Sequence, residues 1–377
     1  MKICEKDLCT GCGVCANVCP EKCIDMAENS IGHPEPVINE EKCIKCGKCV
    51  RSCPNNSNFE RNEAKAVYAC WSQEEKERCE STSGGMANVL SRQILDKGGV
   101  VYGCALTGNG IEHIRVDNID NLYKLQGSKY VQSYMGNVYR DIKKDLEENV
   151  VVLFIGTPCQ CAGVKSFLNK EYNNLYIIDL ICTGVPPQKL LWEHLGYSDK
   201  KPEKIRFRDK VGTRLTVTDN DKIVYQKAVW EDYFLMGFSK HLYLRESCYN
   251  CVWADKKRCS DITLGDFWGL GKEKPFIHNT KNGVSEVFIN SSKGQTLFDS
   301  VSDSIFREER ELEEAFKGNP RYSSPSHAHA NKNKFIAVYE KYGFKKAIKK
   351  SLKKERIKYF IYRVKRSVAQ GMKGRIR

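Results

Sequence analysis

The chain has 377 residues, a formal net charge of +14 and 19 cysteines. It is too long for a single small cysteine-rich module and leaves room for one or two further domains. No apolar run approaches the roughly 18 residues of a membrane-spanning helix. Because no secretory signal opens the chain at Met1–Cys4, the many cysteines favour metal ligation in a reducing cytoplasm over disulfides.

The positive charge is concentrated at the C-terminal end. Residues 331–377 contain 17 Lys and Arg against two Glu, whereas the rest of the chain has 44 basic and 45 acidic side chains. We therefore separate a basic tail, 331–377, from an electrically balanced body. Within that body, a polar stretch after residue 54 separates a short cysteine-rich module, 1–60, from a larger domain, 61–330.

The first module carries a repeated cysteine motif. Cys9-x2-Cys12-x2-Cys15-x3-Cys19-Pro20 recurs as Cys43-x2-Cys46-x2-Cys49-x3-Cys53-Pro54. This run holds two [4Fe–4S] clusters in bacterial ferredoxins, where the fourth cysteine of each motif ligates the other cluster. A zinc site would use two cysteine pairs instead. We expect an α+β ferredoxin-like module with the ligand sets Cys9, Cys12, Cys15, Cys53 and Cys43, Cys46, Cys49, Cys19.

Residues 61–330 show the pattern of an α/β domain. A strand is expected at 66–71, and a helix with apolar residues at helical spacing begins at Met86 and stops at Gly98-Gly99. Continuous apolar runs at 100–106, 150–155 and 175–181, separated by helical segments, predict a mixed, largely parallel sheet. Short antiparallel strands follow at 204–208, 214–218 and 222–225.

Two loops carry small and hydroxylated residues. Ser81-Thr82-Ser83-Gly84-Gly85 opens the helix at Met86, which suits phosphate binding at a helix N-terminus or an ordinary cap. Gly127-Ser128-Lys129 offers a cation and backbone donors to a phosphate or a reduced flavin, or forms a simple surface turn.

A third segment, 156–163, follows a buried strand and starts a helix, at the edge where open α/β sheets bind ligands. It contains Thr157 and Cys159, and the helix N-terminus is expected to lower the pKa of Cys159. From the residues alone, Cys159 is a cluster ligand, a flavin neighbour, a redox thiol or a plain buried cysteine.

Three cysteines further along make most of another metal site. Cys248-x2-Cys251-x7-Cys259 lacks a fourth ligand, for which Cys182 is the nearest candidate and Cys159 the next. Four thiolates would also suit zinc. Because the chain already carries two cluster motifs, we expect a third [4Fe–4S] cluster.

In this order the motifs resemble the beta-subunit family of the coenzyme F420-reducing hydrogenase and dehydrogenases, in the bacterial form with a ferredoxin module in front. The resemblance spans about 1–270. It is carried by Ser83-Gly84-Gly85, Val101-Tyr102-Gly103, 127–133, 156–160, Cys182-x-Gly184-Val185-Pro186, Phe207-Arg208-Asp209-Lys210 and 261–268.

This resemblance implies FAD beside one further [4Fe–4S] cluster. The residues that it implies as flavin contacts are Ser83, Gly84, Gly85, Gly127, Ser128 and Lys129, with Thr157 and Cys159 nearby. Lys129 would stabilise the reduced flavin. Cys182, Cys248, Cys251 and Cys259 become the expected ligands of the third cluster.

We therefore expect an oxidoreductase that accepts electrons from a donor such as ferredoxin and passes them through three clusters to FAD and a hydride acceptor. The acceptor is F420-like or a substrate of surface-polysaccharide biosynthesis, since bacterial relatives resemble members of such gene sets. A non-catalytic electron-transfer subunit that docks to a partner enzyme is the alternative. No acid or base is evident, and the direction of flow is open.

The basic tail predicts an amphipathic helix. Phe344, Ala347, Ile348 and Leu352 mark one face, lysines surround it, and aromatic residues continue it to Val364. Such a helix can bind an anionic membrane surface on the cytoplasmic side or a partner protein, or it can remain a solvated tail. No nucleic-acid recognition motif accompanies the charge.

Overall fold

A computed structural model describes residues 1–209 and 212–362. Lys210, part of one motif above, and the tail beyond residue 362, with Val364, lie outside the described residues. The body is built on an eight-stranded sheet in the order β15-β4-β14-β13-β8-β7-β5-β6. Its strands are β4 (Ala66–Ser72), β5 (Val100–Thr107), β6 (Gly110–Val116), β7 (Val152–Gly156), β8 (Leu175–Leu180), β13 (Ile262–Asp266), β14 (Ser285–Ile289) and β15 (Ile305–Arg310).

The sheet is mixed, as expected. The central strands β13, β8, β7 and β5 pair in parallel, and the four outer pairings are antiparallel. Helices cover both faces of this sheet, so the side chains on both sides of each central strand are buried. This is why these strands read as continuous apolar runs. These helices are α3 (Glu75–Glu80), α4 (Met86–Asp96), α5 (Val138–Glu147), α6 (Pro158–Leu168), α10 (Ser292–Asp299) and α11 (Leu312–Gly318). The expected strands and the helix at Met86 are confirmed within two residues at each end.

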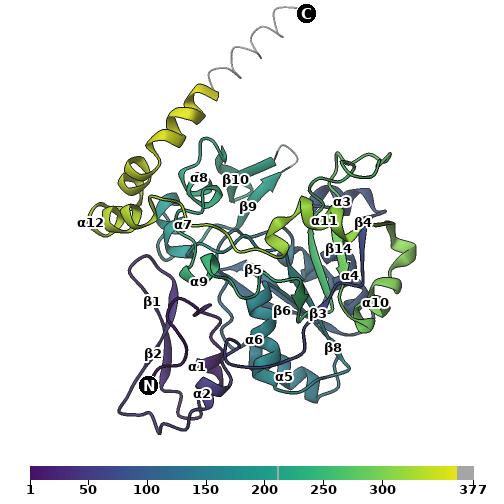
Figure 1. The fold of residues 1–377 in the computed structure, drawn as a ribbon, viewed down its shortest axis with the longest axis horizontal. Coiled ribbons are helices and arrows are strands. Elements are labelled where there is room, and N and C mark those ends of the chain that lie inside the picture. The colour runs from purple at the N-terminus through teal and green to yellow at the C-terminus, as the bar shows by residue number, and fades with distance from the viewer. Residues whose placement is uncertain (210–211, 363–377) are drawn as a thin grey trace, which may run out of the picture.

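A second, smaller sheet lies beside the main one (Figure 1). It has the order β11-β10-β9, with all pairs antiparallel, which confirms the strands expected after residue 203. The sheet comprises β9 (Lys204–Asp209), β10 (Gly212–Asp219) and β11 (Lys222–Ala228). Its neighbours are α7 (Gln188–Leu195), α8 (Tyr233–Ser239) and α9 (Glu246–Tyr249).

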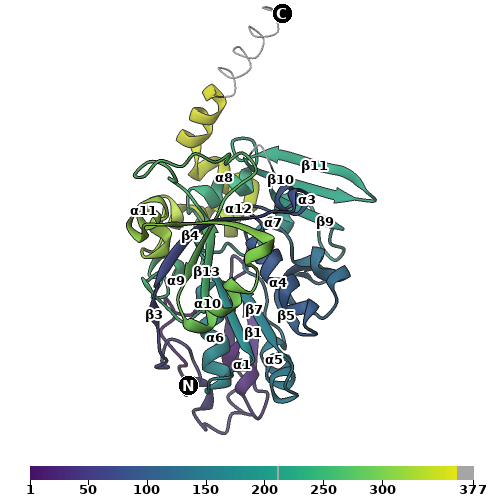
Figure 2. The same ribbon diagram turned by 90° about the vertical axis from the view of Figure 1, so that its right-hand side faces the viewer.

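The N-terminal 60 residues lie against one side of the body (Figures 1 and 2). They contain α1 (Val14–Val18), β1 (Ile24–Glu28), β2 (Pro34–Ile38) and α2 (Lys48–Arg51), with β1 and β2 antiparallel. The linker that follows forms β3 (Asn62–Glu63), which pairs with β12 (Lys257–Arg258). Val14 of α1 and residues of α5 and α6 share one hydrophobic core.

The C-terminal end forms α12 (Lys332–Ser351), which bends at Gly343, and a further helical segment, 353–362, follows it. The predicted apolar face of this region is buried: Phe344, Ala347, Ile348 and Leu352 are at most 2% exposed and pack with α7 and α8. Among the described residues, no helix has the length and apolar character needed to cross a bilayer.

Candidate cofactor sites

The first cysteine motif encloses a small cavity at the start of α1. Burial raises the pKa of Cys12 and Cys15, and the charges of neighbouring cysteines add to this effect. Cys53, from the second motif, reaches across to the same place. The cavity is lined by Cys4, Cys9, Cys12, Cys15 and Cys53, among others. The structure therefore brings together the first predicted ligand set, which we call the first quartet, with Cys4 beside it.

The second quartet is assembled in the same crossed manner. Burial raises the pKa of Cys49, and the charges of Cys19 and Cys46 reinforce the shift. Cys23 adjoins this group, since its Sγ lies 3.4 Å from Cys19 Sγ and its pKa also responds to Cys43. Each motif thus sends its last cysteine to the other, as the ferredoxin spacing requires.

A third group of cysteines lies inside the body. The pKa of Cys159 is not lowered, contrary to what its place at a helix N-terminus led us to expect: burial raises it, and charges on Cys251, Cys182 and Cys248 raise it further. Gly184, with φ +118°, holds Cys182 near Cys248, since its backbone N–H donates to Cys182 Sγ at 3.3 Å. A Cβ at Gly184 would lie 3.4 Å from Cys248 Sγ, so a side chain there would fill the space between these thiols. We call Cys159, Cys182, Cys248 and Cys251 the interior cysteine set.

Cys259 is placed differently from its predicted partners. Burial raises its pKa to about 12, and its charged neighbours are Asp179, Lys165, Arg258 and Arg61. The nearby thiol whose pKa it influences is Cys161, on α6. The structure thus gathers three of the four predicted ligands with Cys159, the runner-up candidate, and sets Cys259 beside Cys161.

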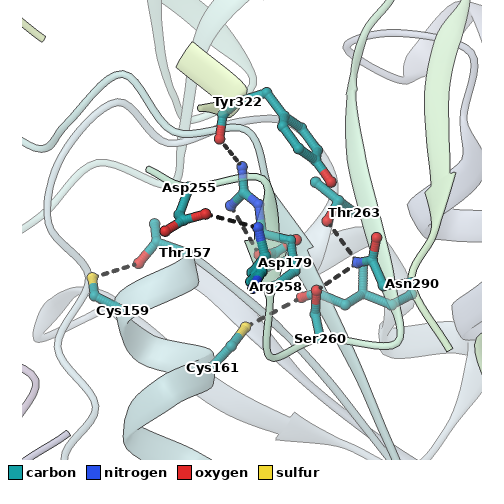
Figure 3. Close-up of polar contacts among 12 residues, drawn as sticks. Thr157, Cys159, Cys161, Asp179, Asp255, Arg258, Ser260, Thr263, Asn290 and Tyr322 are labelled. Carbon is teal, nitrogen blue, oxygen red and sulfur yellow. Dashed lines mark hydrogen bonds and ion pairs between the residues drawn. The ribbon is translucent and has the colours of Figure 1, made fainter. Parts of the chain in front are cut away.

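A buried ion pair adjoins the interior cysteine set. Arg258 Nη1 donates to Asp179 Oδ2 at 3.1 Å, and both side chains are at most 1% exposed. Figure 3 shows Arg258 between Asp179 and Tyr322, with Cys159 and Cys161 projecting from α6 nearby. Burial raises the pKa of Asp179, and Arg258 opposes that shift. Burial raises the pKa of Cys182 and Cys251, and the positive charge of the same guanidinium opposes that shift at both thiols.

These groups do not form a site for one ion. Within residues 1–209 and 212–362, no three His, Cys, Asp or Glu side chains converge as they would on a single metal. A tetrahedral zinc site needs four sulfurs about 2.3 Å from one centre.

The body also contains a large cavity. It has a volume of about 1040 Å³ and lies between the small sheet, the Ser81–Ser83 loop and the Gly127–Lys129 turn. These two loops meet directly, because Ser128 N–H donates to Thr82 Oγ1, 46 residues earlier in the chain, at 3.1 Å. Among the predicted flavin contacts, Ser83, Gly127, Ser128 and Lys129 line the cavity.

The other predicted contacts serve the framework around the cavity. Gly84 packs so closely on β4 that a Cβ there would lie 2.3 Å from Cys70 O. Gly85 precedes the first turn of α4. Thr157 caps α6, where its N–H donates to Gln160 Oε1 at 3.0 Å and its hydroxyl lies 3.2 Å from Cys159 Sγ. Thr157 therefore adjoins the interior cysteine set, of which Cys159 is a member, and neither residue is among those that line the cavity.

Lys129 is held by the backbone. Its Nζ lies 2.9–3.3 Å from four carbonyl oxygens, those of Cys104, Lys124, Leu125 and Gln126. Burial lowers the pKa of this ammonium. Its contacts stabilise the end of the 3₁₀ helix η1 (Ile119–Leu125), which forms one wall of the cavity.

The cavity also contains two functional candidates, Arg208 and Trp268, which the sequence offered only as members of family motifs. Arg208, on β9, forms an ion pair with Asp266 at the end of β13. Its guanidinium carbon lies 5.5 Å from the ring centre of Trp268, whose side chain is 54% exposed. An exposed tryptophan beside a fixed guanidinium offers a stacking surface and a positive charge. In the sequence, the available signal for this site was an aromatic residue, Trp268, at the end of the 261–268 motif.

Comparison with known proteins defines the class. Residues 8–57 match the 4Fe–4S dicluster domain, and residues 150–315 match the family described as the C terminus of the coenzyme F420 hydrogenase/dehydrogenase beta subunit. These two matches agree with the family that the motifs resemble, for residues 150–315, and with a dicluster domain in front of it. This combination is typical of electron-transferring oxidoreductases.

One solved structure resembles the chain at low sequence identity. It is a chain from the xenon-derivatised F420-reducing [NiFe] hydrogenase complex of Methanosarcina barkeri. The alignment has 16% identity and a TM-score of 0.46, and it covers 78% of this chain and 94% of the other. A search of curated proteins gave no match.

Proposed function

We propose that this protein is an iron–sulfur flavoprotein oxidoreductase that holds three [4Fe–4S] clusters and FAD. The observation that carries this proposal is the meeting of the Ser81–Ser83 and Gly127–Lys129 loops at one cavity of about 1040 Å³. That volume is at the upper end for cofactor sites. FAD exchanges one or two electrons and a cluster exchanges one, so together they interconvert single electrons and hydride.

In this proposal the cavity residues bind and orient the flavin. Hydroxyls of the Ser81–Ser83 loop and backbone N–H groups of the Gly127 turn suit its phosphates and ring edge. Trp268 offers a stacking face. Because Lys129 is occupied by four carbonyls, Arg208 is the better-placed cation for negative charge that develops on a ring in the cavity.

We further propose that the interior cysteine set, Cys159, Cys182, Cys248 and Cys251, holds the third cluster, with Cys259 as the competing fourth ligand. Three clusters correspond to about twelve iron atoms per chain. Anaerobically reconstituted Cys159→Ser should fall to about eight, whereas Cys259→Ser should keep the wild-type content. The reverse result would assign Cys259, and about eight iron atoms in the wild type would remove the third cluster.

The test of the overall function is turnover by the isolated protein. The flavin is identified after anaerobic purification, and dithionite-reduced protein is mixed with F420 or with nucleotide-sugar and ketone acceptors of the kind used in polysaccharide biosynthesis. Oxidation of the protein by one class, weakened at least about tenfold in Arg208→Gln, supports the proposal. If no acceptor reacts without a second protein, the chain is an electron-transfer subunit.

A further inference from the structure

The two cysteine motifs differ sharply in charge. The first, Cys9–Cys19, contains no charged residue. Residues 42–51 contain Lys42, Lys45, Lys48 and Arg51 and no acid. All four basic side chains are exposed. The repeat therefore preserves the ligand spacing while it places positive charge around only one of the two quartets.

The two motifs also face different surroundings. The first is bound to the body through its backbone: Arg245 Nη1 donates to Cys9 O at 2.9 Å and Tyr139 Oη to Cys12 O at 3.0 Å. Arg245 itself lies three residues before Cys248. Tyr139 also lies against α6, because a Cβ at Gly163 would lie 2.6 Å from its Oη, so this side chain lies between the first motif and the helix that carries Cys159.

The second motif opens to solvent. Cys46 is exposed, and Ile44, between Cys43 and Cys46, has 61% of its side chain exposed. Next to this loop, Glu40 is paired with the N-terminal ammonium at 2.6 Å. The result is one exposed apolar side chain in a segment that also carries four exposed cations and two of the cluster cysteines, Cys43 and Cys46. We call residues 42–51 the basic face.

We propose that the basic face is the docking surface for a small acidic electron-carrier protein of the ferredoxin type. This inference rests on the proposed function, since it names the partner of its clusters. An exposed apolar residue supplies close contact at the centre of such an interface. The four exposed cations attract an acidic partner to this face and raise the rate of encounter. A cluster held by the second quartet would accept one electron from the reduced carrier in each encounter, with no bond or proton exchanged.

The arrangement also orders the route. Since Arg245 and Tyr139 join the first motif to the elements that carry Cys248 and Cys159, we infer that electrons from a carrier at the basic face would pass the second quartet first and the first quartet next. Arg245 and Tyr139 connect this step to the body.

The test is the rate at which a reduced acidic ferredoxin reduces the reconstituted full-length protein in anaerobic stopped flow. Absorbance of the clusters is the readout. Lys42→Glu/Lys48→Glu should lower the second-order rate constant at least about tenfold at about 0.05 M salt, and the difference should shrink near 0.5 M. Lys345→Glu/Lys349→Glu, equal in charge change but located on α12, should retain the wild-type rate.

An uncharged variant and two control measurements complete the test. Ile44→Ser, which changes no charge, should slow the reaction several-fold at every salt concentration because it removes the apolar contact. Iron content and the rate of reduction by dithionite should be unchanged in each variant. Wild-type rates in both basic-face variants, or an equal loss in the α12 variant, would overturn the proposal. Because cluster absorbance is read directly, absence of FAD or of turnover would leave this result intact.

Discussion

The N-terminal module and the C-terminal helix both share an apolar core with the body, but the module adds a buried charged anchor. The module is held by directional hydrogen bonds around Arg245, which is only 3% exposed. Its guanidinium donates to Cys9 O, to Pro34 O and to Gln132 Oε1, all neutral acceptors. A buried charge bound in this way is costly unless every donor is satisfied, so the geometry is tightly defined.

The helix α12 is held instead by apolar contact. Phe335 and Phe344 are almost fully buried and pack on Tyr243 with ring centres 5.1 and 6.0 Å away. Apolar contact stabilises strongly but has little directional preference. The difference teaches that hydrogen bonds fix position where cluster sites adjoin the body, whereas apolar burial suffices where a segment only has to stay attached.

The largest effect should come from removing an apolar anchor of the helix. Phe344→Ala should reduce the free energy of unfolding by about 3–5 kcal/mol, because a large buried ring leaves a cavity. Denaturant unfolding measures this loss. Phe360→Ala, at a side chain that is 63% exposed, is the control and should change stability by no more than about 0.5 kcal/mol. Equal effects would show that α12 is not anchored by its buried face.

The next effect should come from the polar contact. Arg245→Gln should cost about 2–3 kcal/mol, because buried acceptors lose their donors. Hydrogen exchange should rise at residues 9–12, and iron should be lost faster from the N-terminal module. Arg140→Gln removes an exposed donor to Asn17 O and serves as the control, with a smaller effect. Unchanged exchange at 9–12 in Arg245→Gln would contradict the role of the guanidinium.

Acid should weaken the module and spare the helix. His33, next to Pro34 and 2% exposed, has its pKa lowered to about 3 by burial and then by the charge of Arg245. Below the unfolded value of about 6.5 the unfolded chain takes up a proton that folded His33 does not, so stability is lost as pH falls. Between pH 7 and 5.5 the module should lose about 1 kcal/mol by hydrogen exchange. His33→Gln should flatten this dependence, and a slope that persists in the variant would assign it elsewhere.

The smallest effect concerns the exposed end of the helix. Ile357, Phe360 and Ile361 are 48–63% exposed and lie at helical spacing among Lys353, Lys354 and Lys358. We propose that this stripe, rather than the buried face expected from the sequence, contacts anionic lipid. Co-sedimentation with phosphatidylserine vesicles should fall in Ile357→Ser/Phe360→Ser and not in Lys42→Glu/Lys48→Glu. Equal binding by all forms would remove the proposal.

The sequence was sufficient where structure is local. The spacing of the cysteines predicted which of them form the first and second quartets, and apolar runs predicted the central strands. Both patterns depend on neighbours in the chain. The face of Phe344 was predicted as apolar, but periodicity does not say what covers such a face. The structure covers it with α7 and α8.

The sites between distant segments were not predictable in this way. The bond from Ser128 to Thr82 depends on how two loops fold over the sheet. Likewise, Cys182 and Cys159 were both plausible partners of Cys248, and chain order favoured Cys259 as the remaining ligand. Only the placement of α6 beside the Cys182 loop brings Cys159 to this group.

The position of β4 in the sheet has a consequence for how the protein is made. This strand directly follows the N-terminal module, yet both its neighbours, β14 and β15, come from the far end of the body, and Cys70 pairs with Ser285. On the ribosome, β4 therefore emerges early and waits with both edges unpaired until most of the chain has been synthesised. Such distant pairing slows folding and exposes an aggregation-prone edge. A chain that stops before β15 would retain that open edge permanently.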